Sequence, residues 1–213
     1  MTLSSIFVIF DIICKTTILS MKRLFSFFIL LFPLLGFAKT TPEILSDKID
    51  SDGFRIIDCS RITVGKWTDR ISTSLSLSCI QVGDSATYYL TIKMVSASPL
   101  NIRQGSALVL RFGDNEVAQL STGIEYSDNI GDYNAYAKVS YYTIYPSYQL
   151  SDYILEKITR FGIRKFRIET VLKNIDRELD NDKLKEVAIF LREEYRLIQN
   201  QIDNKANDIM EGF

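Results

Sequence analysis

The chain has 213 residues, of which 25 are basic and 26 acidic, so its formal net charge at neutral pH is −1. This balance argues against a nucleic-acid-binding protein, because such proteins carry an excess of basic residues that neutralise phosphates. The chain has no histidine, which excludes Ser-His-Asp and Cys-His catalysis, histidine-ligated zinc and an imidazole general base.

The first feature along the chain has the layout of a secretory signal peptide, at residues 21–38. Lys22 and Arg23 form a basic start, residues 24–35 form an apolar run, and small residues lead to a cleavage point after Ala38. Because such a leader is removed during export, we expect an exported protein that resides in the periplasm or outside the cell.

The segment in front of Met21 is apolar but is interrupted by Asp11 and Lys15. We interpret residues 1–20 as the product of an over-extended start, with translation beginning at Met21. The alternatives are a long atypical leader and an uncleaved membrane anchor. The apolar run is shorter than the roughly 20 residues that a spanning helix needs. We therefore expect no membrane span in the mature form, residues 39–213, which are enough for one domain.

The first elements expected in the mature chain are a short helix and a series of strands. Thr41 and Pro42 are residue types that often begin a helix. From Phe54 onward apolar and polar residues alternate, most clearly in residues 71–82 and 86–95. Such alternation is typical of antiparallel strands with one buried face.

A hairpin and a further strand come next. Residues 107–112 and 116–120 flank a short Gly-Asp-Asn sequence, which suits a tight hairpin loop. Residues 136–147 have the composition of another strand, and Pro146 ends it.

The pattern then becomes partly helical. Residues 151–162 have apolar residues at helical spacing, with Ser151 as a cap and Gly162 as a stop. Residues 163–170 return to strand alternation, and a last helix is predicted at about 182–209. Together these elements predict an α+β fold, namely a single domain rich in antiparallel β-sheet. A short helix and a long C-terminal helix would cover one face of a single sheet.

The strand that follows the short helix carries a recognisable sequence. Its residues are Gly162, Ile163, Lys165, Phe166, Arg167, Ile168 and Glu169. The second half of the chain, with this strand before a charged C-terminal helix, resembles small secreted proteins of uncharacterised function from Bacteroidetes-type bacteria. The resemblance implies export and a small sheet-rich fold, and it implies no activity.

The C-terminal helix carries an apolar seam at alternating four- and three-residue spacing. Its members are Leu184, Ala188, Leu191, Tyr195, Ile198, Ile202 and Ile209. Glu193 and Glu194 are placed off this seam, while Val187 and Phe190 widen the apolar surface. We therefore expect the helix to dock on its own domain in a monomer, with a coiled-coil dimer as the alternative.

Cys59 and Cys79 are the only cysteines after the leader. An even number in an oxidising compartment permits one disulfide, and a hairpin that turns near Asp69 would place the two opposite each other. The alternative is a pair of buried thiols that act as small apolar side chains.

Tyrosines are concentrated between residues 126 and 148. The candidates for a ligand-binding surface are Tyr133, Tyr136, Tyr141, Tyr142, Tyr145 and Tyr148. Tyrosine is enriched at recognition surfaces because it buries a large area at low entropic cost, so such a surface would hold a glycan or a peptide. Tyrosine also favours strands, and a strand needs no ligand.

A basic cluster follows, formed by Arg160, Arg164, Lys165 and Arg167 without an acidic residue between them. It would meet an anionic group of a partner or a lipid surface. The alternative is a solvated strand edge, whose charges discourage strand-to-strand aggregation.

Acidic turn sequences occur at Asp50-x-Asp52 and at Asp128-Asn129-x-x-Asp132. Neither has the spacing of an EF-hand, and Asp and Asn are common in turns, so we expect no metal and no cofactor. The chain also lacks a Gly-rich phosphate loop and the GxSxG and SxxK motifs.

These observations favour an exported, non-catalytic interaction or structural module with an unknown protein or glycan partner. The alternative is a histidine-free hydrolase that uses two carboxylates on envelope or dietary polymers. A cleft with two facing carboxylates would favour the enzyme.

Overall fold

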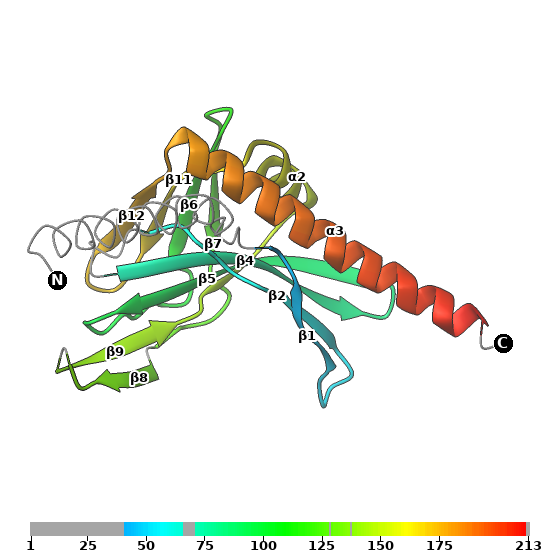
Figure 1. The fold of residues 1–213 in the computed structure, drawn as a ribbon, viewed down its shortest axis with the longest axis horizontal. Coiled ribbons are helices and arrows are strands. Elements are labelled where there is room, and N and C mark those ends of the chain that lie inside the picture. The colour runs from blue at the N-terminus through cyan, green and yellow to red at the C-terminus, as the bar shows by residue number, and fades with distance from the viewer. Residues whose placement is uncertain (1–40, 66–70, 128, 137, 212–213) are drawn as a thin grey trace, which may run out of the picture. The chain divides into compact units, whose positions relative to one another are not determined.

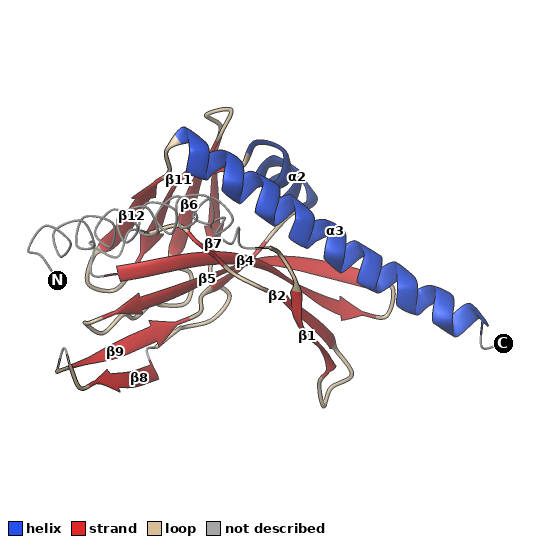
Figure 2. Cartoon of the chain, in the orientation of Figure 1, coloured by secondary structure: helices blue, strands red, loops and turns tan. Residues whose placement is uncertain are grey.

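The computed structural model describes residues 41–65, 71–127, 129–136 and 138–211. They form an α+β domain of two antiparallel sheets and two helices, as Figures 1 and 2 show, which confirms the predicted fold class. The strands are β1 (Ile44–Ile49), β2 (Arg55–Cys59), β3 (Ile62–Thr63), β4 (Ile71–Val82), β5 (Ser85–Ser96), β6 (Ala107–Phe112), β7 (Val117–Ser121), β8 (Asn129–Asn134), β9 (Val139–Ile144), β10 (Ser147–Gln149), β11 (Ile163–Glu169) and β12 (Asn174–Glu178). The helices are α2 (Asp152–Phe161) and α3 (Asn181–Glu211).

The larger sheet is organised around the long hairpin β4–β5. Its strand order is β1-β2-β4-β5-β9-β8, with β3 also on β4 and β10 also on β5. The alternation in β4 and β5 divides their side chains between two faces. Leu75, Leu77, Leu90 and Ile92 are fully buried on the inner face. The serines and threonines between them point to the outer face.

The smaller sheet has the order β12-β11-β6-β7. The expected single sheet was therefore wrong, because the hairpin β6–β7 pairs with β11 and not with the long hairpin. Phe166 of β11 lies opposite Leu110 of β6, and both are buried. Each of these strands has only one apolar face, and the smaller sheet turns that face toward the larger sheet.

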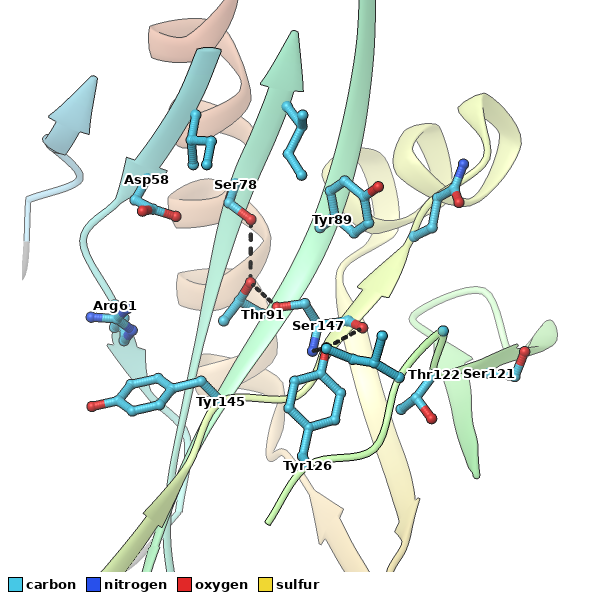
Figure 3. Close-up of a pocket in the computed structure, with 15 residues that line it drawn as sticks. Asp58, Arg61, Ser78, Tyr89, Thr91, Ser121, Thr122, Tyr126, Tyr145 and Ser147 are labelled. Carbon is cyan, nitrogen blue, oxygen red and sulfur yellow. Dashed lines mark hydrogen bonds between the residues drawn. The ribbon is translucent and has the colours of Figure 1, made fainter. Parts of the chain in front are cut away.

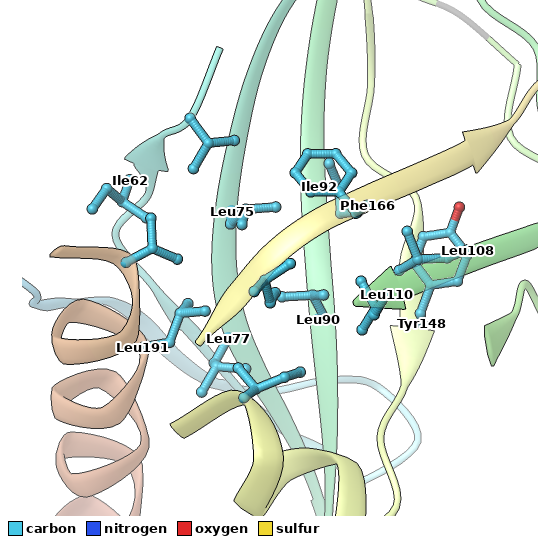
Figure 4. Packing of buried hydrophobic residues seen from close by; sticks show 14 of the residues in the cluster. Ile62, Leu75, Leu77, Leu90, Ile92, Leu108, Leu110, Tyr148, Phe166 and Leu191 are labelled. Atoms are coloured by element: carbon cyan, nitrogen blue, oxygen red, sulfur yellow. The ribbon is translucent and has the colours of Figure 1, made fainter. Parts of the chain in front are cut away.

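One hydrophobic core lies between the two sheets and the helices. Figure 4 shows β11 crossing in front of β4 and β5, with Phe166 close to Ile92 and Leu108 close to Tyr148. Leu191 of α3 closes the core beside Leu77 (Figure 4). The core therefore takes side chains from elements far apart in the sequence.

Helix α2 begins and ends as predicted. The Ser151 side chain accepts a hydrogen bond from the backbone N–H of Ile154, with 3.4 Å between the atoms. Gly162 has a φ of 72°, and its N–H donates to the carbonyl of Ile158. A Cβ at Gly162 would lie 2.8 Å from the Cβ of Ala188, so glycine permits both the left-handed turn and the close approach of α3.

Helix α3 docks on its own domain along the predicted seam. Leu184, Leu191 and Ile198 are buried, as are Val187 and Phe190. Tyr195 packs edge-on against Tyr88 of β5, with 5.3 Å between the ring centres. The side chain of Ile209 lies outside the described residues. The docking of the described seam onto the sheets is therefore an intramolecular contact.

The predicted short helix at residues 41–45 is absent, because residues 41–43 form no regular element and Ile44 and Leu45 begin β1. β1 pairs with β2 around a turn in which the Asp50 carboxylate accepts hydrogen bonds from the N–H groups of Asp52 and Phe54. Gly53 supplies a φ of 84°. The pairing with β2 outweighs a local helix start, and Asp50 has an ordinary turn role.

The predicted signal peptide lies outside the described residues. Of the two described helices, neither combines the length and the apolar character that a membrane crossing requires.

Candidate functional site

The outer face of the larger sheet carries an open pocket with a volume of about 760 Å³. We call it the outer-face pocket. Its floor is formed by β2, β4, β5 and β10, and its wall is the segment 121–126 after β7. Figure 3 shows side chains from all of these elements pointing into a common space. The pocket therefore lies on the opposite side of the sheet from the hydrophobic core.

A row of three hydroxyl groups crosses the floor of the pocket. The Ser78 and Thr91 oxygens are 3.2 Å apart, and the Thr91 and Ser147 oxygens are 2.9 Å apart (Figure 3). The row exists because Ser147 lies directly opposite Thr91 in the register of β10 with β5. A hydroxyl both donates and accepts, so this hydroxyl row can present either kind of group to a ligand.

Tyr126 holds the wall of the pocket in place. Its hydroxyl accepts a hydrogen bond from the N–H of Ser147 at 3.0 Å and lies 3.3 Å from the Ser147 carbonyl, to which it donates. Its backbone bridges to Ile102. The wall is thus tied both to β10 and to the segment before β6, and the pocket is preformed.

Two cations share one aromatic ring at the edge of the pocket. The Arg61 guanidinium lies 5.3 Å from the centre of the Tyr145 ring, and the Lys93 ammonium lies 5.8 Å from it. Both are cation–π contacts. Among the described residues, no carboxylate pairs with Arg61 or Lys93, and the Asp58 carboxylate in the same pocket makes no ion pair.

The predicted tyrosines are not gathered into one surface. Tyr145 lines the pocket, whereas Tyr148 is fully buried on the inner face, where burial raises the pKa of its phenol. Tyr133 and Tyr136 are exposed away from the pocket lining. Tyr141 and Tyr142 are half-buried on β9.

The predicted candidates left out two tyrosines of the pocket, Tyr89 and Tyr126, although Tyr126 belongs to the tyrosine-rich stretch at residues 126–148. Tyr89 is one of the residues of β5 that face away from the core, so the alternation of this strand already indicated that its side chain lies on the outer face. Tyr126 reaches the site through a loop, which no periodicity predicts.

The basic cluster faces acidic partners from an unpredicted strand. Arg167 makes two hydrogen bonds to Asp176 of β12, at 2.7 and 2.9 Å. The Lys165 ammonium lies 3.4 Å from a carboxylate oxygen of Glu178. The other two members also have partners, Glu156 for Arg160 and Asn181 for Arg164. The structure thus gives each of the four a neighbouring acceptor.

Cys59 and Cys79 are free, buried thiols, so the disulfide alternative is not present. The register of β2 with β4 places Cys79 opposite Ile57, which leaves the two cysteines diagonal to each other. Diagonal neighbours are about 7–8 Å apart, whereas a disulfide needs a Cα separation of roughly 5.5–6 Å. Burial raises the pKa of Cys79 to about 11 and raises the pKa of Cys59 further.

Glu194 is fully buried on α3, so its placement off the seam was wrong. It lies three residues after Leu191 and four before Ile198, on the same helix face. Its carboxyl accepts a hydrogen bond from the N–H of Leu77 at 2.8 Å. This N–H faces the gap between the end of β2 and the start of β3, where β4 has no partner strand on that side. Burial raises the pKa of Glu194 to about 9, against the opposing effects of the Leu77 hydrogen bond and Arg61.

Within the part of the chain that the structure describes, no three acidic or cysteine side chains gather closely enough to hold a metal ion. The side chain of Asp132 and the whole of Asp128 lie outside that part. No protein-family model, curated protein or solved structure matches this chain.

Proposed function

We propose that the protein is an exported, non-catalytic binding module and that the outer-face pocket is its binding site. The observation that carries this proposal is the pocket itself, which has a preformed wall, a hydroxyl floor and charged groups that make no ion pair with any described residue. Small-molecule sites commonly combine such a volume with a few convergent polar groups. The ligand would be a glycan or a segment of a protein.

In the outer-face pocket, the alternative of a two-carboxylate hydrolase has less support. Among the described residues that line the pocket, Asp58 carries the only carboxylate. Glycoside hydrolysis normally requires a second carboxylate within about 10 Å, facing the same ligand. Glu194 does not serve, because its carboxyl is fully buried in the interface of α3 with the sheet.

The proposal of export rests on the leader at residues 21–38 and on the resemblance to small secreted bacterial proteins. Neither feature identifies a ligand, so the function has to be tested by an experiment that does not require the ligand to be chosen in advance.

A variant that fills the pocket provides this test. Gly123 lines the pocket, its φ is not in the left-handed region, and a Cβ there would meet nothing within 4 Å. Gly123→Trp should therefore fold normally and obstruct the pocket. Immobilised wild-type protein and this variant would be compared for the glycans and proteins that they retain from the envelope extract of the source cell.

The matched control is Ala97→Trp, which adds the same indole at an exposed position outside the pocket lining. We expect a component that both the wild type and Ala97→Trp retain and that Gly123→Trp loses. Equal retention by all three proteins would assign binding to another surface and would reject the pocket as the site.

A further inference from the structure

The charges around Tyr145 restrict the ligand class, and this inference rests on the binding function proposed above. Arg61 and Lys93 approach the same ring, and neither makes an ion pair with a described carboxylate, although Arg61 also acts electrostatically on the buried Glu194. Two like charges near one ring repel each other, and the ring quadrupole compensates only in part. This end of the pocket therefore favours an anionic group.

The rest of the pocket is suited to neutral hydroxyl groups. The hydroxyl row of Ser78, Thr91 and Ser147 offers donors and acceptors at spacings close to 3 Å. Asp58 adds a carboxylate that makes no ion pair within the part of the chain that the structure describes, and the Gln149 side chain adds an amide. Such mixed polar groups beside aromatic rings match a ligand with several hydroxyls and small apolar patches.

We propose that the outer-face pocket binds an acidic saccharide, a sugar unit that carries a carboxylate. The carboxylate lies at the Tyr145 end beside Arg61, and Lys93, which is near the same ring but outside the pocket lining, adds positive potential there. The sugar hydroxyls lie along the hydroxyl row and reach Asp58. A guanidinium is well suited to this role, because it binds carboxylates through two parallel hydrogen bonds.

Paired probes test this proposal. Glucuronate and galacturonate each differ from a neutral sugar, glucose or galactose, only at the carboxylate carbon. Titration of the isotope-labelled protein followed by NMR detects even millimolar affinities. We expect the two acidic sugars to shift signals of the pocket residues, with at least tenfold weaker binding of the neutral sugars. We also expect acidic-sugar affinity to fall as salt rises.

Two charge variants check the assignment of the carboxylate. Arg61→Gln and Lys93→Gln should each weaken acidic-sugar binding at least fivefold and leave neutral-sugar binding unchanged. Lys48→Gln, which removes a charge from the exposed face of β1, should change neither. Lys93→Gln keeps the test decisive if Arg61→Gln fails to fold.

Three outcomes would overturn the proposal. Equal binding of acidic and neutral sugars would show that Arg61 and Lys93 do not bind a carboxylate of the ligand. Binding of acetate as strong as that of the acidic sugars would reduce the site to a general anion site. Absence of binding by all four sugars would reject the ligand class. In each case the retention experiment with Gly123→Trp still decides separately whether the pocket is a binding site.

Discussion

Glu194 fills a break in the sheet. On this side of β4, β2 pairs with residues 78–81 and β3 pairs with Ser74 and Leu75. The N–H of Leu77 lies between these two pairings and therefore lacks a strand partner. A buried N–H without an acceptor costs about 1–3 kcal/mol. The Glu194 carboxyl supplies that acceptor from α3. The Leu77 N–H and Arg61 each lower the pKa of Glu194, which opposes the effect of burial. Glu194 in turn raises the pKa of the neighbouring Cys59.

Burial of Glu194 makes the stability of the protein depend on pH. Its pKa is raised by burial from an ordinary value of 4.5 to about 9 in the folded protein. Below pH 4.5 both states bind the proton, and the full contribution to stability is present. Between pH 4.5 and 9 the unfolded state ionises while the folded state stays neutral. We therefore expect stability to fall by up to about 1.4 kcal/mol per pH unit in this window.

Glu194→Gln is the matched control for this prediction, because the amide carbonyl still accepts from Leu77 and cannot ionise. Urea unfolding of both proteins at several pH values would measure the difference. The stability of the wild type relative to the variant should decline from pH 5 to 9. A constant difference would show that Glu194 has an ordinary pKa and is solvated.

The two thiols should behave as inert core side chains. Both are buried, and burial raises their pKa values, so little thiolate forms at neutral pH. We expect an alkylating reagent to leave Cys59 and Cys79 unmodified in the native protein. In denaturant without reductant, mass measurement should find both alkylated. A denatured, unreduced protein that takes up no reagent would instead contain the disulfide.

At the scale of elements, α3 connects the two sheets. Its buried side chains contact the inner face of the larger sheet near Leu77, and it also packs against β11 and α2. Farther along the helix, Arg55 pairs with Asp47 at 2.7 Å and donates to the carbonyl of Gln201. The Gln201 amide also donates to Asp47. These contacts fix the position of the helix along β1 and β2.

Substitution on the buried and exposed sides of α3 should separate docking from surface effects. Leu191 is fully buried, whereas Ile189 on the same helix is 41% exposed. Leu191→Asp should lower the free energy of unfolding by about 3–5 kcal/mol, because it removes a core side chain and buries a carboxylate. Ile189→Asp should change it by about 0.5 kcal/mol. Thermal unfolding with light scattering would measure stability and mass together.

The opposite result has a clear meaning. A wild-type dimer that Leu191→Asp converts into folded monomers would show that this face mediates self-association. The intramolecular docking of α3 would then be wrong.

Two of the elements that sequence reasoning missed share a physical cause. β1 and β12 are short, lie at sheet edges and contain many polar residues, so their alternation is weak. β12 is defined by its partner, because Arg167 and Asp176 face each other across the strands. By contrast α2 was predicted with both ends, since Ser151 and Gly162 act on their own neighbours. Features that depend on neighbouring residues in the sequence could therefore be predicted, whereas features that depend on pairing with a distant strand could not.

At the scale of the molecule, alternation predicted which residues of β4, β5 and β11 face inward, but it assigned the wrong face to Phe54 and Ile56 and did not predict how strands divide between two sheets. Residues 107–112 pair with residues 163–169, some fifty residues later, and no local pattern encodes that choice. The outer-face pocket depends on the same long-range register. Tyr145 alone was predicted for it, because Asp58, Arg61 and the hydroxyl row become neighbours only when β2, β4, β5 and β10 are aligned.

The proposed export concerns the whole molecule, and the predicted leader indicates where the mature chain would begin. All described helices and strands lie after Ala38, the first being β1 at Ile44, so cleavage there removes none of them. We expect mass analysis of the protein isolated from its own cell to give Lys39 as the N-terminal residue, in the periplasmic or extracellular fraction. Protein that retains Met1 or Met21 in a membrane fraction would contradict cleavage and would support the anchor. A pocket that binds an acidic saccharide would then act at the membrane surface.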